Sequence, residues 1–203
     1  MEIQLIDAMI ESLKLNELIE LESIPNIDLY MDQVITLFEE KLAHTKRNKE
    51  DKLLTKTMIN NYAKDKLLMP AKKKKYTKEH IILMILLYEM KQILTIADIK
   101  DIFGTIIKDG EVDSEKLSNI YKIYLKMKVK GLDAFENQVN AINSDLKEEI
   151  ENLAEIEGKV EDEITQDMLM AILLTQKANY YKRLAEKIID EKISPINRGN
   201  MKK

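Results

Sequence analysis

The sequence has few of the residues that interrupt helices. Among its 203 residues there are only five glycines and three prolines. Because these residues end helices and form most tight turns between strands, their scarcity predicts long helices rather than a sheet of many strands. Tryptophan is absent and phenylalanine occurs three times, so Leu, Ile and the 11 Met must fill most of the core. We therefore predict an all-α fold with at most a small β wing.

The sequence also lacks cysteine, which excludes disulfides, thiolate metal sites and cysteine nucleophiles. The first 22 residues carry acidic side chains throughout and no basic stretch at their start, unlike a signal peptide. The longest apolar run, residues 81–88, is too short to cross a bilayer. From these absences we expect a cytoplasmic protein that makes no contact with a membrane.

The motifs of common catalytic and cofactor sites are missing as well. The two histidines, His44 and His80, stand in no zinc-binding or di-iron spacing. A lone histidine at a helix start, such as His80, is more often a packing or capping group than a ligand. The scattered glycines form no phosphate-binding loop, and no serine lies in a nucleophile elbow. We therefore predict no enzyme activity, no cofactor and no metal.

Charge is distributed unevenly along the chain. The net charge is −4, yet residues 44–80 hold 12 Lys/Arg against 4 Asp/Glu, a local net charge of +8. Residues 133–167 hold 12 acidic side chains against two lysines. A basic segment in an acidic chain indicates a local site for a polyanion. The alternative for the same pattern is a lysine-rich loop that is merely solvated.

Apolar periodicity predicts a series of helices joined by short polar breaks. We expect an N-terminal helix within residues 1–23, followed by helices at about 27–43, 55–66, 77–94, 95–106, 113–130, 132–160 and 165–193. Residues 44–51 form a loop, Gly131 interrupts the chain, and residues 194–203 form a flexible tail. The helix at 77–94 is apolar nearly all round, which predicts a central core helix.

The basic segment contains a short helix followed by a lysine run. Thr55 is a plausible N-cap, and Met58, Ile59 and Tyr62 form the apolar face of the helix. Pro70 ends the element, and the following Ala-Lys-Lys-Lys-Lys is too polar to pack, so it forms a short hairpin or a loop.

A helix that presents Lys, Thr and Asn can lie in the major groove of DNA. Asparagine can pair with adenine through two hydrogen bonds, threonine can contact a thymine methyl group, and lysine can reach guanine or phosphate. The neighbouring lysines can neutralise phosphates, which makes affinity salt-dependent. The candidate DNA-binding residues are Thr55, Lys56, Thr57, Asn60, Asn61, Lys64, Lys72, Lys73, Lys74, Lys75 and Tyr76.

The order of these elements resembles the winged helix-turn-helix of MerR-type regulators. Tyr62 matches the last tyrosine of their recognition helix, Leu67-Leu68-Met69-Pro70 matches their L-L-x-P step, and Tyr76 matches the wing tyrosine. Residues 95–99, Thr-Ile-Ala-Asp-Ile, match their S-L-x-E-I helix. The sequence departs from the signature at Asn60, Asn61 and Lys66, where those proteins have arginine, an aromatic residue and glycine.

A closer resemblance, over about residues 24–108, is to an uncharacterised bacterial family catalogued as a domain of unknown function. It rests on IPNIDLYMDQVITLFEEKL, LTKTMINNYAKDKLLMP, KKYTKEHIILMILLYEMKQ and LTIADI. Together the resemblances imply a winged helix-turn-helix-like domain at 24–110 and a C-terminal helical region at 111–193 for dimerisation or sensing. They imply a homodimeric transcriptional regulator that binds duplex DNA, its effector ligand unidentified. The alternative is a non-enzymatic helical module that binds a protein partner.

Overall fold

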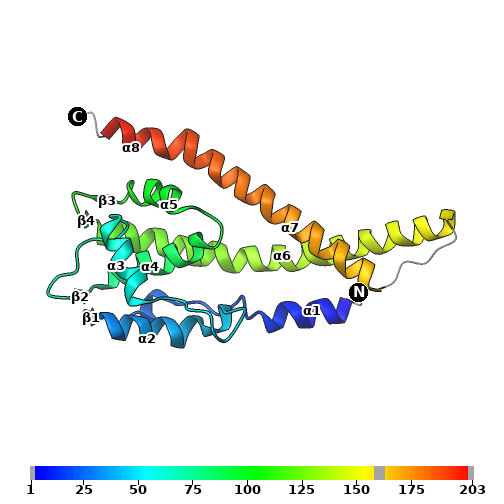
Figure 1. Ribbon diagram of the computed structural model, residues 1–203, viewed down its shortest axis with the longest axis horizontal. Helices are drawn as coiled ribbons and strands as arrows, with labels where there is room; N and C mark the ends of the chain where they lie inside the picture. The colour runs from blue at the N-terminus through cyan, green and yellow to red at the C-terminus, as the bar shows by residue number, and fades with distance from the viewer. Residues whose placement is uncertain (1–2, 158–162, 201–203) are drawn as a thin grey trace. The chain divides into compact units, whose positions relative to one another are not determined.

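The computed structural model describes residues 3–157 and 163–200, and within them helices dominate (Figure 1). The described residues contain four strands, each of two residues, which pair into two small antiparallel sheets. The all-α prediction is therefore confirmed. In this described part of the chain, no helix has the length and apolar content needed to cross a membrane.

The chain divides into two compact units, which alternate along the sequence. One, the hairpin unit, comprises residues 17–125 and the described residues from 182 onward; the other, the three-helix unit, comprises residues 3–16 and 126–181 as far as they are described. This division differs from the predicted one, since residues 17–23 and 111–125 join the hairpin unit. The helices α6 (Ser114–Glu157) and α7 (Glu163–Ile188) each contribute to both units.

The hairpin unit is built around α4 (Lys78–Lys91), as its apolar sequence predicts. Seven of its residues are buried, including Ile81, Leu83 and Leu87. Around it lie α2 (Met31–Leu42), α3 (Lys56–Lys64), α5 (Ile96–Phe103) and the first part of α6. The hydroxyl of buried Tyr121 donates a 2.6 Å hydrogen bond to the carbonyl of Ile19, which ties the start of this unit to α6.

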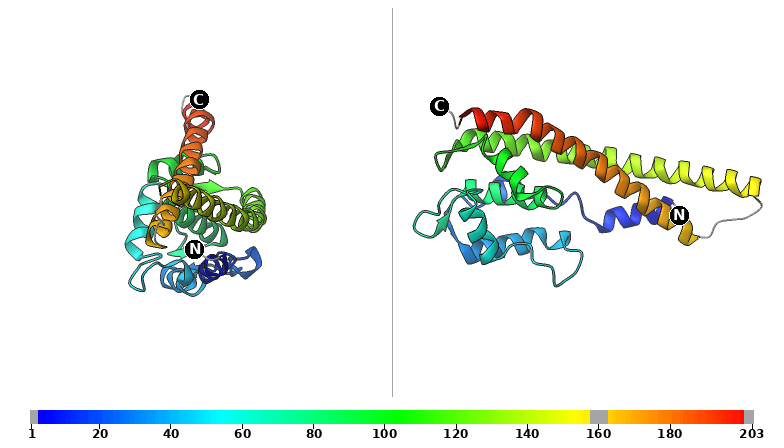
Figure 2. Two further views of the ribbon diagram at one scale, coloured as in Figure 1. Left: turned by 90° about the vertical axis from the view of Figure 1, so that its right-hand side faces the viewer. Right: turned by 45° about the horizontal axis from the view of Figure 1, so that its top comes forward.

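Two tight β-hairpins belong to the hairpin unit. In the first, here the lysine hairpin (residues 72–75), Lys72 pairs with Lys75, and β2 (Lys75–Tyr76) continues into a second pairing with β1 (Leu29–Tyr30). In the second, the Asp-Gly hairpin (residues 107–112), β3 (Ile107–Lys108) pairs with β4 (Glu111–Val112). Both hairpins lie at the same end of the unit (Figures 1 and 2).

The three-helix unit has a separate apolar core. It combines α1 (Ile3–Ser12) with the second part of α6 and the first part of α7, and its buried residues include Ile6, Val139, Leu146 and Met170. Asn143 is buried in this unit and accepts a 3.5 Å hydrogen bond from the side chain of Gln166. The apolar stripe predicted over 132–160 is helical up to residue 157; residues 158–160 lie outside the described part.

Three boundary predictions are wrong. The N-terminal helix ends at Ser12 rather than near residue 21, because the chain turns at Lys14, whose φ is 51°. Gly131 does not interrupt α6, since one glycine costs only about 1 kcal/mol in a long helix. Residues 194–200, predicted to be flexible, form α8 (Ser194–Asn200), which follows a five-residue π-helical segment before Pro195.

The position of α8 has a specific cause. The Ser194 hydroxyl donates to the Asp101 carboxylate, and the Asn197 amide donates a 2.7 Å hydrogen bond to the Asp101 carbonyl. A Cβ atom at Gly104 would lie 3.0 Å from the Asn197 side chain, so the missing side chain permits this close approach. These four polar and small residues thus hold α8 against the end of α5, and residues 201–203 lie outside the described part.

Candidate nucleic-acid interface

The helix α3 begins and packs as its sequence predicts. The Thr55 hydroxyl accepts a 3.2 Å hydrogen bond from the backbone N–H of Met58, so Thr55 is the N-cap. Ile59 and Tyr62 are buried against the core, and Met58 is half-buried. Burying this face fixes which side chains of the helix remain in solvent.

The exposed face of α3 contains every side chain predicted to read DNA from this helix. Lys56, Thr57, Asn60, Asn61 and Lys64 are all exposed, and the helix contains no acidic residue. The Lys56 ammonium lies 2.7 Å from the Asp32 carboxylate on α2, but both side chains are more than half exposed. Such an exposed pair contributes little to stability, and Lys56 can exchange Asp32 for another anion at small cost.

The helix ends in a Schellman motif centred on a lysine. The N–H of Leu67 donates to the carbonyl of Tyr62 at 2.9 Å, and the N–H of Lys66 donates to the carbonyl of Ala63 at 3.1 Å. Lys66 has a φ of 60°, the left-handed conformation that glycine usually supplies at this position. This is the position at which the MerR-type signature has glycine.

The lysine run forms a hairpin; the sequence predicted either a short hairpin or a loop at these residues. The N–H of Lys75 donates to the carbonyl of Lys72 at 3.0 Å, and the two residues between them, Lys73 and Lys74, have φ values of 52° and 63°. Two central residues with positive φ define a type I′ turn, which favours Asn-Gly or Asp-Gly. Lys72, Lys73 and Lys74 are exposed, and no carboxylate among the described residues lies within ion-pair distance of them.

Lys75 and Tyr76 anchor this hairpin. The Lys75 ammonium lies 5.0 Å from the ring centroid of Tyr30, its partner across β1 and β2, in a cation–π contact. Tyr76 is only 6% exposed, so its ring faces the core and is not available to a polyanion. Burial also raises the pKa of the Tyr76 hydroxyl. Tyr76 therefore positions the hairpin rather than offering a contact surface.

His80 fixes the base of the same hairpin. Its Nδ1 accepts a 3.1 Å hydrogen bond from the Thr77 N–H, which leaves the proton on Nε2 to be donated to the Met69 carbonyl at 3.1 Å. Its ring packs edge-on against Tyr76, with centroids 5.5 Å apart. Burial lowers the pKa of His80, which favours this neutral form. The predicted packing and capping role of His80 agrees with these contacts.

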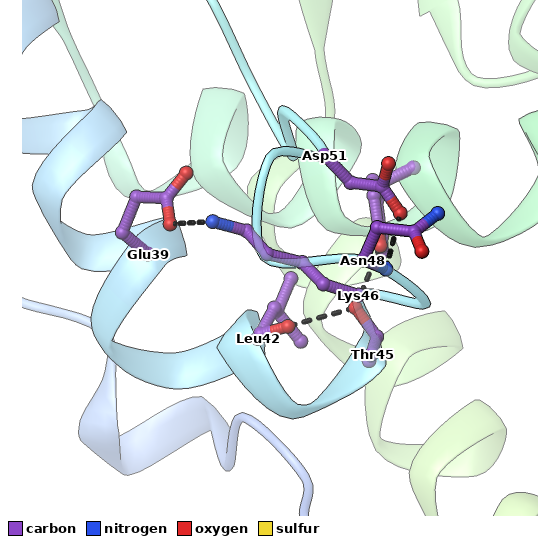
Figure 3. Close-up of polar contacts among 7 residues, drawn as sticks. Glu39, Leu42, Thr45, Lys46, Asn48 and Asp51 are labelled. Carbon is purple, nitrogen blue, oxygen red and sulfur yellow. Dashed lines mark hydrogen bonds and ion pairs between the residues drawn. The ribbon is translucent and has the colours of Figure 1, made fainter.

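The charged segment between α2 and α3 begins with a short 3-10 helix (Ala43–Thr45) and continues as a loop, with contacts to α2, to α4 and within itself (Figure 3). The Lys46 ammonium pairs with the Glu39 carboxylate, and the N–H of Asn48 donates to the Asp51 carboxylate at 2.9 Å. The Thr45 hydroxyl donates to the carbonyl of Leu42 at 2.7 Å and lies 2.6 Å from the Tyr88 hydroxyl. The ion pair of Lys46 thus neutralises part of the local positive charge.

Two lysines distant in sequence lie beside the end of α3, in a groove that Asp101 and Asp109 also line. Lys100 and Lys108, together with Lys66, line a groove of about 800 Å³ that also contacts Pro70 and the Asp109–Gly110 turn. Lys100 and Lys108 were not among the predicted residues, because isolated lysines on α5 and β3 form no run in the sequence. Only the folded chain brings them beside the end of α3.

The part of the chain that contains α3 and both hairpins matches a known protein family. A family model described as "Domain of unknown function (DUF1836)" matches residues 19–124. The chain belongs to the DUF1836 family. The DUF1836 match covers nearly all of the first segment of the hairpin unit, residues 17–125, and so includes α3 and both hairpins. It confirms the predicted membership of an uncharacterised family. No curated protein and no solved structure matches the chain.

Proposed function

We propose that this DUF1836 protein binds duplex DNA, with α3 in the major groove and the lysine hairpin on the phosphate backbone. The exposed face of α3 carries the proposal, because it offers lysine, threonine and asparagine without any acidic residue. In the complex, Asn60 and Asn61 read adenine edges, and the lysines contact phosphate or guanine. Tyr76 takes a positioning role instead of contacting DNA.

The lysine turn supports this proposal independently. A left-handed backbone costs about 1–2 kcal/mol for each residue other than glycine. Lys73 and Lys74 both adopt it, at a turn where Asn-Gly would be relaxed. Backbone strain concentrates at functional sites. The left-handed turn lowers the stability of the hairpin. The hairpin presents three unpaired ammonium groups to solvent, which a phosphate-binding wing requires.

We further propose a homodimeric transcriptional regulator of the MerR-like winged helix-turn-helix type. The left-handed conformation of Lys66, at the glycine position of that signature, favours the type. The dimer uses the exposed side of α7 in the three-helix unit, where Met168, Ile172 and Thr175 line a hollow of about 480 Å³. Asp167 precedes this uncharged stretch and Lys177 follows it, so two antiparallel copies place opposite charges together.

DNA binding is tested by fluorescence anisotropy on a labelled duplex of random sequence, titrated at several salt concentrations. We expect affinity to fall steeply with salt, with a slope of about −0.9 per phosphate neutralised. Replacing Lys72, Lys73 and Lys74 with alanine reduces the magnitude of that slope by up to about 3. The matched control replaces Lys122, Lys126 and Lys130 of α6 with alanine and leaves the slope unchanged. Absence of binding at low salt contradicts the proposal.

The dimer is tested separately by sedimentation equilibrium. Ile172→Glu places a charge in the hollow on α7 and shifts the protein toward monomer, while Ser144→Glu, an equally charged change at an exposed position of α6, does not. A protein partner is the second candidate function, favoured by the same exposed apolar side chains. A wild-type protein that is monomeric at all concentrations, and does not bind DNA, supports that candidate instead.

A further inference from the structure

A small cavity of the hairpin unit is lined by α3, α4 and the segment before α3. Apolar side chains of α3 and α4, among them Met58, Met84 and Leu87, line it together with the ring of Tyr62, and Tyr88 and Gln92 add polar groups. Met84 and Leu87 are each 1% exposed. The cavity volume is about 180 Å³. An enclosed cavity of roughly 150 Å³ holds benzene, so the volume here is of the order that a single ring requires.

Two lysines stand at the rim of this cavity. Lys52 comes from the segment before α3, and Lys91 from the end of α4. The Lys91 ammonium lies 5.6 Å from the ring centroid of Tyr62, so it is held over one wall. Both lysines are exposed, and neither has a carboxylate within ion-pair distance among the residues the structure describes. Two cations at the entrance to an apolar floor define the chemistry of an occupant.

We propose that this cavity binds a small organic carboxylate whose body is a single ring or a branched alkyl group. The carboxylate pairs with Lys52 and Lys91, and the apolar body packs on Met58, Met84 and Leu87. Ligand sites commonly combine apolar side chains with a few placed polar groups. The occupant touches both α3 and α4, so it holds these two helices together. The inference stands whether or not the protein binds DNA.

The two methionines provide a direct measurement, because methyl-¹³C methionine gives one NMR signal per residue. Met58 is assigned by the signal lost in Met58→Leu, and Met84 in the same way. Titration with benzoate is expected to shift both signals and to leave those of Met127 and Met168, which are exposed on α6 and α7, unchanged. Benzoate that shifts neither Met58 nor Met84 overturns the proposal.

Charge selectivity separates the carboxylate site from a nonspecific apolar hollow. Benzyl alcohol, a neutral analogue of similar size, is expected to bind at least about tenfold more weakly than benzoate, since the charged hydrogen bonds are lost. Lys52→Met with Lys91→Met removes this preference, whereas Lys49→Met, an exposed lysine of the same loop, preserves it. Equal binding of the two ligands by the wild type, or an unchanged preference in the double variant, overturns the assignment of the lysines.

Discussion

The two hairpins of the hairpin unit share one turn geometry, but different parts of each hairpin stabilise it. Asp109 and Gly110, with φ values of 53° and 77°, are residues that a type I′ turn favours. Lys73 and Lys74 adopt nearly the same φ values without glycine or asparagine. The strands next to the two turns differ in burial. Leu29 and Tyr76, next to the lysine hairpin, are buried, whereas Ile107 and Val112 of the Asp-Gly hairpin are half-buried.

The stability of each hairpin therefore comes from a different part of it. The Asp-Gly hairpin is stable at its turn and needs little from its strands. The lysine hairpin is strained at its turn and depends on its base, where Tyr76, His80 and β1 hold it to the core. The Asp-Gly turn lies close to the chain just before the lysine hairpin, since a Cβ on Gly110 would lie 3.8 Å from Cδ of Pro70. Variants at the turns and at the bases can therefore test this contrast within one local environment.

The largest effect is expected at the base of the lysine hairpin. Tyr76→Ala removes a buried aromatic side chain and should lower the free energy of unfolding by about 3–5 kcal/mol. Val112→Ala, the matched truncation in the other hairpin, should cost about 1 kcal/mol because Val112 is half-buried. Urea denaturation measures both values. Equal costs would show that the two bases contribute alike.

The next largest effect is expected when the strained turn is transferred to the other hairpin. Replacing Asp109 and Gly110 with two lysines puts a β-carbon at a position with a φ of 77° and should destabilise the protein by about 1–2 kcal/mol. Gly110→Ala alone should account for most of that loss, which identifies conformation rather than charge as the cause. A fully stable double variant would mean that lysine is not strained in a type I′ turn of this protein.

The reverse exchange relaxes the lysine hairpin. Lys73→Asn with Lys74→Gly should raise the free energy of unfolding by about 1 kcal/mol, since the turn then has its preferred residues. The same variant should weaken DNA binding and reduce the magnitude of the salt slope by about 2, because two phosphate contacts are lost. Gains in both stability and DNA affinity would contradict the proposed role of the two lysines.

These contrasts also mark how far the sequence determines the structure. The cap at Thr55, the buried face with Ile59 and Tyr62, and the core helix α4 follow from local periodicity and were predicted. The choice between hairpin and loop at residues 72–75 could not be made locally, because β2 pairs with residues 29–30, far away in the sequence. Local propensity cannot specify a partner that only the folded core brings near.

The same reason explains the errors and omissions at other sites. Residues 194–200 look like a frayed tail until Asp101 and Gly104 provide a place for Ser194 and Asn197. Lys100 and Lys108 gain their position beside Lys66 only through tertiary packing. Tyr76 was predicted to contact DNA, but it is buried and instead positions the lysine hairpin. Charge patterns thus located the basic surface, and packing determined which side chains form it.

The smallest effect is a pH dependence confined to the lysine hairpin. Burial holds the pKa of His80 below its ordinary value of 6.5, so the unfolded chain binds a proton more readily than the folded one. Stability is therefore fully present above pH 6.5 and is lost as pH falls below it toward the folded-state pKa. Protonation would remove the acceptor at Nδ1 that the Thr77 N–H uses.

Hydrogen exchange at Tyr76 and Val112, compared at pH 7.5 and pH 5.5 after correction for intrinsic exchange rates, measures this effect at each hairpin. Acid should accelerate exchange at Tyr76 more than at Val112, because His80 packs against Tyr76. Asp28 and Glu79 favour the charged histidine, while Lys72 opposes it together with burial, so the Lys72→Ala variant should show a smaller acid effect. His44→Gln removes the other histidine and should leave the difference intact. If His80→Gln keeps the same acid sensitivity, another group causes it, and the base of the lysine hairpin does not depend on the neutral imidazole.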